Sequence, residues 1–207
     1  MATKKENRAS AKLLKTEPVQ PEGFKWVQLA KLTYEDAEGK ERQWEMSMRS
    51  TRKGDVDGVA VVCRLLKKGE KPKTVLVSQF RPPANAYVLE VPAGLVDEGE
   101  TAEQAAIREL KEETGFTATR VTHVSPIVLS DPGVSGDTMQ YVTVEVDLDA
   151  EENLNPKANP EEGEHIDIHI VEIDSLLSVL QDPTQVVQDR PKVVVDARLF
   201  GLALSML

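Results

Sequence analysis

The 207-residue chain is poor in cysteine and contains no long apolar run. Its single cysteine, Cys63, cannot form an internal disulfide and lies in an apolar stretch, which fits a reducing compartment. No segment approaches the roughly 20 apolar residues that a membrane span needs. These absences exclude a disulfide-stapled domain and a membrane helix. They favour the cytoplasm, with the nucleus as the alternative.

Positive charge is also scarce, because the formal net charge is −10. The first fifteen residues carry five Lys or Arg against Glu6, which is +4, so the remainder carries −10 − 4 = −14. Such a body repels nucleic acid, so no nucleic-acid partner is expected. It would also repel a diphosphate, so bound cations and a few placed arginines would be needed to hold one.

Residues 1–20 form a basic segment with Ser and Ala that lacks the apolar core of a secretory signal. Glu6 and Glu17 argue against a mitochondrial presequence. We therefore expect a disordered tail. Residues 21–56 should form N-terminal strands, and residues 57–207 should form one domain with its own core.

Alternation and turn residues predict an α+β protein in which strands precede, interrupt and follow the helices. A hairpin is expected around the turn Asp36–Gly39. Ala150–Gly163, rich in Glu, Asn and Pro, should be a long loop. The expected strands are 26–33, 41–48, 59–66, 74–80, 87–91, 121–129, 139–146 and 166–171. The expected helices are 102–114, then 174–180 with Asp174 as its cap, and about 195–207.

The most informative segment runs from Gly94 to Phe116 and reads GLVDEGETAEQAAIRELKEETGF. Thr101 and Gln104 form a capping-box pattern, so a helix should begin at the next residue after Thr101. Gly115 can end it in the left-handed conformation.

On this helix one stripe should pack against a sheet, with Ile107 and Leu110 at its apolar centre. Glu109, Glu112 and Glu113 fall on the opposite side, at spacings where like charges repel. Carboxylates that converge in this way suit Mg²⁺ or Mn²⁺. A charged face in solvent is the plainer alternative.

The loop before the helix favours the metal site, because an apolar strand runs into Val91-Pro92-Ala93-Gly94 and its carbonyls can face the same ions. Strand, loop and helix resemble the Nudix hydrolases: Gly, five residues, Glu, seven residues, Arg-Glu-aliphatic, one residue, Glu-Glu, one residue, Gly-apolar. The resemblance implies an α/β/α sandwich, here with an N-terminal β-hairpin extension.

Further segments resemble the branch that hydrolyses ADP-ribose and other ADP-sugars. Pro132 lies sixteen positions after Phe116, as in that branch. The resemblance covers roughly residues 24–207, and it also rests on Trp26, Trp44, Arg49–Lys53, Gln79–Pro83 and Asp131–Gly133. It implies metal-dependent hydrolysis of ADP-ribose or a related ADP-sugar to AMP and a sugar phosphate.

The resemblance also implies roles for particular residues. Metal contacts would come from the Ala93 carbonyl, Glu109, Glu113 and Glu112, and Arg108 would orient carboxylates. The general base would come from the late loop, where we expect Glu164, with Glu162 as the alternative. Arg49, Arg81 and Leu95 would contact substrate, and Glu90 is a weaker candidate.

Trp26 and Trp44 resemble the tryptophans that stack on adenine in this branch, where the pair comes from two subunits. A homodimer is therefore implied. The alternative for each tryptophan is a place in the core. Two other functions stay open: a sanitiser of nucleoside triphosphates, and a catalytically silent sensor of ADP-ribose. Catalytically silent members usually lose one of the glutamates of the Gly94–Phe116 motif, and none is missing here.

Overall fold

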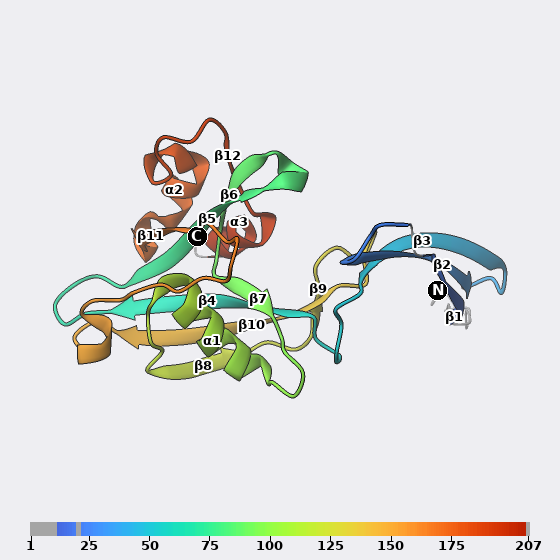
Figure 1. Cartoon of the computed structure of the whole chain (residues 1–207), viewed down its shortest axis with the longest axis horizontal. Helices are drawn as coiled ribbons and strands as arrows, with labels where there is room; N and C mark the ends of the chain where they lie inside the picture. The colour runs from blue at the N-terminus through green and yellow to red at the C-terminus, as the bar shows by residue number, and fades with distance from the viewer. Residues whose placement is uncertain (1–11, 20–21, 206–207) are drawn as a thin grey trace, which may run out of the picture. The chain divides into compact units, whose positions relative to one another are not determined.

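The computed structural model describes residues 12–19 and 22–205, which divide into two compact units (Figure 1). One unit contains the described residues up to Asp57 together with Val128–Thr138. The other contains Gly58–Ile127 and the described residues from Met139 onward. The sequence placed the start of the core domain at residue 57 but did not predict that Val128–Thr138 belongs to the N-terminal unit.

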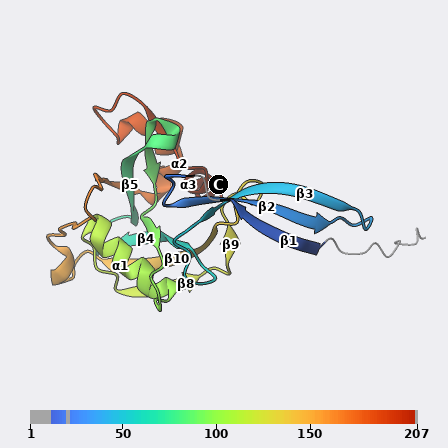
Figure 2. The ribbon, with the colours of Figure 1, turned by 45° about the vertical axis from the view of Figure 1, so that its right-hand side comes forward.

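The N-terminal unit contains a three-stranded antiparallel sheet in the order β1 (Lys12–Val19), β2 (Val27–Glu35) and β3 (Glu41–Arg49), seen together in Figure 2. The predicted hairpin is confirmed. The Asp36 carboxylate closes its turn, because it accepts from the backbone amides of Glu38 and Lys40 at 3.0 and 2.9 Å. Arg42 donates to the same carboxylate at 2.8 Å.

Strand β1 corrects the expectation of a disordered tail over residues 1–20. Residues 12–19 pair with β2, from Lys12 opposite Glu35 to Val19 opposite Leu29. The composition of this segment hid the strand, because its stability comes from backbone pairing with a neighbour and not from its own apolar residues. Residues 1–11 and 20 of that predicted tail lie outside the described residues.

The second unit is built on a mixed sheet with the strand order β12-β6-β5-β4-β10-β8. Strand β11 also pairs with β5, and β7 pairs with β4. The pairs β4–β10 and β6–β12 are parallel, and β4–β5, β5–β6, β8–β10, β4–β7 and β5–β11 are antiparallel. The strand bounds are β4 Gly58–Leu66, β5 Lys73–Arg81, β6 Ala86–Glu90, β7 Ala93–Leu95, β8 Arg120–Val124, β10 Thr138–Asp147, β11 Asp167–Glu172 and β12 Val193–Val195.

Two strand predictions need correction. The expected strand 121–129 is broken into β8 and the short β9 (Val128–Leu129), with Pro126 between them, which has no amide to donate to a ladder. Strands β7 and β12 were not predicted, because each has only three residues. The long loop Ala150–Gly163 is present and contains the short 3₁₀ turn η2 (Glu151–Asn153).

Helix α1 (Ala102–Thr114) begins and ends as predicted. Thr101 Oγ1 accepts from the Gln104 amide, the Gln104 side chain accepts from the Thr101 amide, and Gly115 follows in the left-handed conformation with φ +78°. The packing stripe is rotated from the prediction, since Leu110 is fully buried but Ile107 is 40 % exposed. Two small buried alanines at 105 and 106 let the helix approach the sheet closely.

The opposite face of the sheet is covered by α2 (Leu176–Gln181) and α3 (Ala197–Leu204), which completes the predicted α/β/α arrangement. Val62 of β4 lines a hollow with Leu176 and Leu199, whereas Val59 and Val61 belong to the core beneath α1. Asp174 does not cap a helix; it lies in the 3₁₀ turn η3 (Ile173–Ser175) and accepts from Lys71 at 3.1 Å. Helix α3 begins after β12, two residues later than expected.

Cys63 lies in this core and is 1 % exposed. Burial in apolar surroundings raises the pKa of its thiol to about 12. Among the described residues no helix is long and apolar enough to cross a membrane.

The packing of α1 predicts a contrast between two of its apolar residues. Leu110→Ala should lower the free energy of unfolding by about 2–5 kcal/mol, because it leaves a cavity between helix and sheet. Ile107→Ala should change it by less than about 1 kcal/mol, because that side chain is largely in solvent. Urea denaturation followed by circular dichroism measures both. Equal losses would contradict this orientation of the helix.

Candidate active site

The candidate site begins where β6 ends and the chain passes through Val91-Pro92 into β7. The Pro92 carbonyl accepts from the Val61 amide at 2.8 Å, which fixes the turn on the sheet. The Ala93 amide donates to Oε2 of Glu113 at 3.1 Å. A Cβ on Gly94 would lie 1.9 Å from Oε1 of Glu109, so any side chain here would displace the Glu109 carboxylate from its present position.

Glu113 is only 3 % exposed although the sequence placed it on the face away from the core. Burial raises the pKa of its carboxyl to about 8, and the negative charges of Glu109 and Glu164 add to the rise. Burial also raises the pKa of Glu109, with further contributions from Glu112 and Glu164. Two neighbouring carboxylates are thus held where their charged forms need a positive partner.

Arg108 is the hub of this cluster, because all five of its N–H groups have protein partners. It grips Glu100 in a bidentate pair at 3.0 and 2.9 Å and donates to Glu109 at 2.7 Å and Glu112 at 3.0 Å. The last donor reaches the Leu95 carbonyl at 2.9 Å. A guanidinium used in this way orients carboxylates and has no donor left for a ligand.

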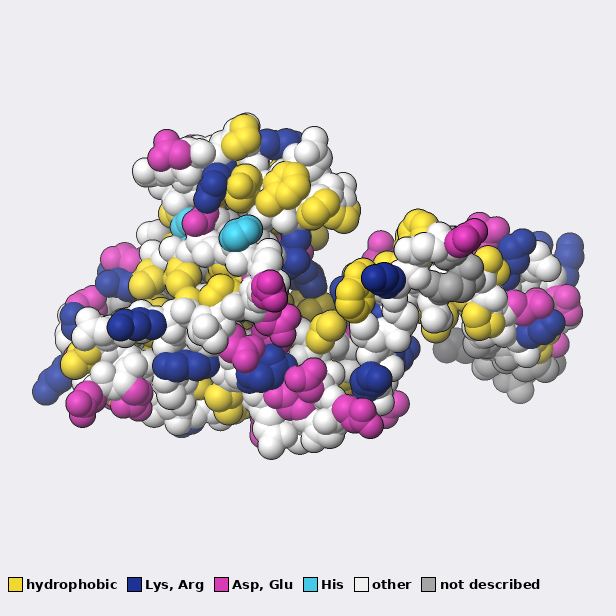
Figure 3. Space-filling model, viewed as in Figure 1, with side chains coloured by type: hydrophobic (Ala, Val, Ile, Leu, Met, Phe, Trp, Pro, Cys, Tyr) yellow, Lys and Arg dark blue, Asp and Glu magenta, His cyan; other side chains and the backbone are white. Residues whose placement is uncertain are grey.

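The donor set fits a divalent cation, since hard carboxylate oxygens and backbone carbonyls are what Mg²⁺ and Mn²⁺ prefer. Acidic side chains gather with a basic group among them in Figure 3. Within residues 12–19 and 22–205, however, no three Asp, Glu, His or Cys side chains are already arranged to hold one ion. One reason is that Arg108 engages Glu109 and Glu112, so binding would require these carboxylates to rotate toward the ion.

Of the two candidate bases, Glu164 belongs to this cluster, because its charge raises the pKa of both Glu109 and Glu113. Its own Oε2 accepts from the Glu161 amide at 3.2 Å. Glu162 is exposed and is not among the main causes of either shift.

Arg81 lies at the end of β5 and is held by Glu90, which is 6 % exposed. Nε and Nη2 of Arg81 donate to the Glu90 carboxylate at distances of 2.8–3.2 Å. The positive charge of Arg81 also lowers the pKa of Glu113 against the effect of burial. The sequence named both residues but not their pairing, for which separate strands give no signal.

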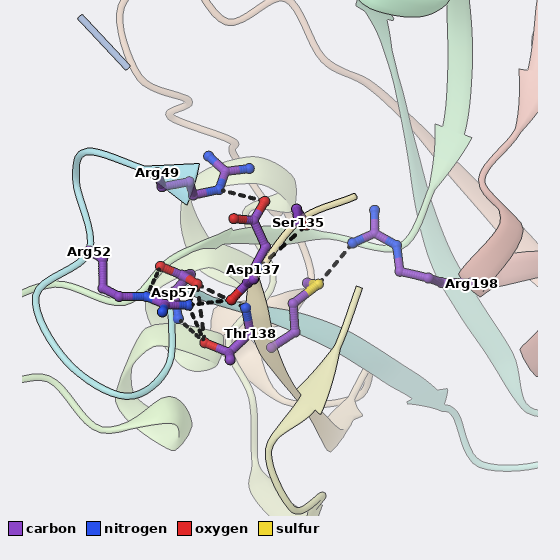
Figure 4. Close-up of polar contacts among 9 residues, drawn as sticks. Arg49, Arg52, Asp57, Ser135, Asp137, Thr138 and Arg198 are labelled. Atoms are coloured by element: carbon purple, nitrogen blue, oxygen red, sulfur yellow. Dashed lines mark hydrogen bonds and ion pairs between the residues drawn. The ribbon is translucent and has the colours of Figure 1, made fainter. Parts of the chain in front are cut away.

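Of the remaining predicted contacts, Leu95 lies in β7 of the second unit and is 40 % exposed, and the others lie in the N-terminal unit. Trp26 is 71 % exposed and Trp44 49 % exposed, so neither belongs to a core. Trp44 Nε1 donates to the Gly133 carbonyl at 3.1 Å and lines an open hollow with Lys31, Gln43 and Glu45. Arg49 forms an ion pair with Asp137 at 3.6 Å (Figure 4).

The sequence also missed two polar clusters, and Figure 4 shows the first of them together with Arg198 of the second. In the N-terminal unit, the buried Asp57 accepts from Nε of Arg52 at 2.9 Å and from the Thr138 amide at 2.8 Å. In the other unit, Arg198 donates to Asp196 and to the Met139 sulfur at 2.9 Å. Spacing along the chain gives no sign that Thr138 and Met139 join these pairs, because both come from a distant segment.

Comparison with known proteins identifies the class. The NUDIX domain matches residues 56–194, and the chain therefore belongs to the NUDIX family, whose members generally use divalent metal ions. The chain is 38 % identical over 211 residues to the ADP-ribose pyrophosphatase of Saccharomyces cerevisiae, covering 100 % of this chain and 88 % of that protein. It is 38 % identical to the ADP-sugar pyrophosphatase of Mus musculus, covering 94 % and 87 %.

A solved structure described as an ADP compounds hydrolase has the same fold, with a TM-score of 0.63 over 86 % of each chain at 20 % identity. The α+β prediction and the family resemblance are thus confirmed.

The raised pKa of Glu113 predicts how the metal-free protein responds to pH. Because the folded pKa of about 8 exceeds the ordinary value of 4.5, this group stabilises the fold fully below pH 4.5 and ceases to do so as pH rises toward 8. In EDTA, the melting temperature of wild type should therefore fall between pH 5 and 8.5. Glu113→Gln should make that fall shallower.

Thermal unfolding by circular dichroism measures this effect, with Glu172→Gln on the exposed side of β11 as the matched control. An identical pH dependence in wild type and Glu113→Gln would contradict the raised pKa.

Proposed function

We propose that the protein is a hydrolase that cleaves the diphosphate of ADP-ribose and related ADP-sugars in a metal-dependent reaction. The products are AMP and a sugar phosphate, which is ribose 5-phosphate when ADP-ribose is the substrate. One observation carries the proposal. The segment from Gly94 to Phe116 has the required residue at every defined position of the Nudix motif. The chain also matches an ADP-ribose pyrophosphatase and an ADP-sugar pyrophosphatase over nearly its whole length.

The metal is Mg²⁺, with Mn²⁺ as a possible substitute. Glu109, Glu113 and Glu112 would hold it together with the Ala93 carbonyl. The amide of the same Ala93 already donates a hydrogen bond to Glu113. When bound, a divalent ion lowers the pKa of water and neutralises phosphate charge. The burial of Glu109 and Glu113 supports this assignment, because a dication offsets the cost of keeping both ionised.

The protein groups divide the remaining work. Glu164 accepts a proton from the attacking water, whose oxygen forms a bond to phosphorus while the bridging P–O bond breaks. Glu162 is the alternative base, but it is exposed, whereas the charge of Glu164 raises the pKa of both Glu109 and Glu113, which favours Glu164. Arg108 holds the carboxylates in place. Within the part of the chain that the structure describes, Arg81 retains free N–H groups beyond its bonds to Glu90, and these suit a phosphate oxygen.

Trp26 and Trp44 provide the adenine site in this proposal, with Arg49 and Leu95 as further substrate contacts. The high exposure of both indole rings supports it, because large aromatic surface in solvent is costly unless a ligand or partner covers it. In the resembling branch the two tryptophans come from different subunits, so the proposal includes a homodimer formed by residues 21–56. The proposed compartment is the cytoplasm, with the nucleus as the alternative.

Two other functions make different predictions. A triphosphate sanitiser would prefer nucleoside triphosphates, and a silent sensor would bind ADP-ribose without turnover. The intact set Glu109, Glu112 and Glu113 argues against the sensor, and Pro132 with the exposed tryptophans argues against the sanitiser.

The function predicts a product pattern. With Mg²⁺, the protein should convert ADP-ribose to AMP and ribose 5-phosphate, with little release from ATP or 8-oxo-dGTP, as measured by chromatography. EDTA should abolish turnover, and Glu109→Gln should lower kcat by orders of magnitude while the circular dichroism spectrum stays unchanged. Binding of ADP-ribose without products would favour the sensor, and hydrolysis that survives exhaustive EDTA would refute metal dependence.

The adenine site predicts a second pattern. Trp44→Ala and Trp26→Ala should each weaken binding of ADP-ribose by about 1–3 kcal/mol, because one stacking face is lost. The KM should rise while kcat changes less, since stacking lies away from the reacting phosphorus. Steady-state kinetics measure this, with Phe24→Ala as an exposed aromatic control. Unchanged KM values in both tryptophan variants would exclude stacking.

A further inference from the structure

The loop that precedes Glu164 is held against the end of helix α1. Its first anchor is Asn153, whose side chain is buried. Asn153 Oδ1 accepts from the Thr117 amide at 2.8 Å, and Nδ2 donates to the carbonyls of Thr117 and Asp147 at 3.1 and 2.9 Å. The Asn153 side chain thus ties the start of this loop to Thr117, just after the helix, and to the end of β10.

The second anchor is Gly115, over which the loop backbone passes. A Cβ on Gly115 would lie 2.3 Å from the Lys157 nitrogen and 2.8 Å from the Ala158 nitrogen. These are backbone atoms, so the loop itself would have to move. Glycine is therefore needed here twice, once for its φ of +78° and once for the space above it.

The third anchor joins the loop to the helix that carries the glutamates. The Asn159 amide donates to the Glu112 carbonyl at 2.7 Å. That carbonyl lies in the last turn of α1, where no further helical amide is available to it. The loop thus completes the hydrogen bonding of the helix at the residue beside Glu113.

The same loop ends in the turn that presents Glu164. The Glu164 amide donates to the Glu161 carbonyl at 3.1 Å, and Gly163 takes a φ of +91°. The Glu164 charge then reaches Glu109 and Glu113. Only four residues separate the Asn159 anchor from Glu164, so a shift of the loop over Gly115 would be passed on to this carboxylate.

We propose that Gly115 is a positioning residue whose missing side chain leaves a seat for the loop backbone, and that this seat sets the place of Glu164 beside Glu109 and Glu113. The inference rests on the proposed function, because it concerns the base of that reaction. The end of the helix and the loop act as one part, so the carboxylates and the base keep their relative positions.

The test compares two glycines with the same backbone strain. Gly69 has a φ of +81°, and a Cβ added there would have no atom within 4 Å. Gly115 has a φ of +78°, but a Cβ added there would clash with the Lys157 backbone. Gly69→Ala and Gly115→Ala should therefore share the strain, but only the second should displace the loop. We expect kcat for ADP-ribose to fall at least tenfold further in Gly115→Ala, since a misplacement of 1 Å can cost about a hundredfold. The KM should stay within threefold.

A double-mutant cycle with Glu164→Gln separates positioning from general damage. If Gly115→Ala has already displaced the base, adding Glu164→Gln should cost far less than the 10²–10⁴-fold loss expected of that change in wild type, about the usual contribution of a general base. In the Gly69→Ala background the loss should stay full. Additive losses for Gly115→Ala, or equal kcat values for the two glycine variants, would overturn the proposal.

A measurement independent of activity keeps the two hypotheses apart. Hydrogen exchange of the peptide that contains Asn159 should be faster in Gly115→Ala than in wild type or Gly69→Ala, because the bond to the Glu112 carbonyl is lost. An inactive wild type would refute the proposed function. Unchanged hydrogen exchange in Gly115→Ala would refute the proposal that Gly115 positions the loop. If Gly115→Ala does not fold, Asn153→Asp replaces it in both experiments, with exposed Asn155→Ala as its control.

Discussion

The structure depends on one unfavourable interaction, the burial of neighbouring carboxylates on α1. The ionised carboxylates of Glu109 and Glu113 would have a lower free energy in water than in the protein. Burial therefore raises the pKa of both. The surrounding residues accommodate that burial: Gly94 leaves room for one carboxylate, the Ala93 amide bonds the other, and Arg108 supplies the positive charge. The divalent cation that we propose for this site would offset the cost of that burial.

Arg108 organises the site through its protein partners alone. Lysine in its place would keep the charge but not the planar fork that reaches Glu100, two further carboxylates and a carbonyl at once. Arg81 differs, because one carboxylate holds it and several of its donors stay available. The number of unused N–H groups thus separates an arginine that orients the protein from one suited to an anion.

Local signals in the sequence predicted well what is decided locally. The residues that cap the helix at Thr101, end it at Gly115 and form the family pattern all lie in or beside α1. The structure confirms both ends of the helix. The rotation of that helix depends on what the sheet offers, so Ile107 was wrongly assigned to the core and Glu113 wrongly to the outer face. Strand β1 and the anchors of Asn153 could not be predicted at all, because each needs a partner from elsewhere in the chain.

The lone thiol of Cys63 has a practical consequence for anyone studying this protein. At neutral pH almost none of it is ionised, and the core shields it from reagents, so maleimides and disulfides should leave it untouched. A cysteine introduced at any exposed position would then be the one reactive handle on the described chain. Spectroscopic probes and crosslinkers could be attached there without first removing the native residue.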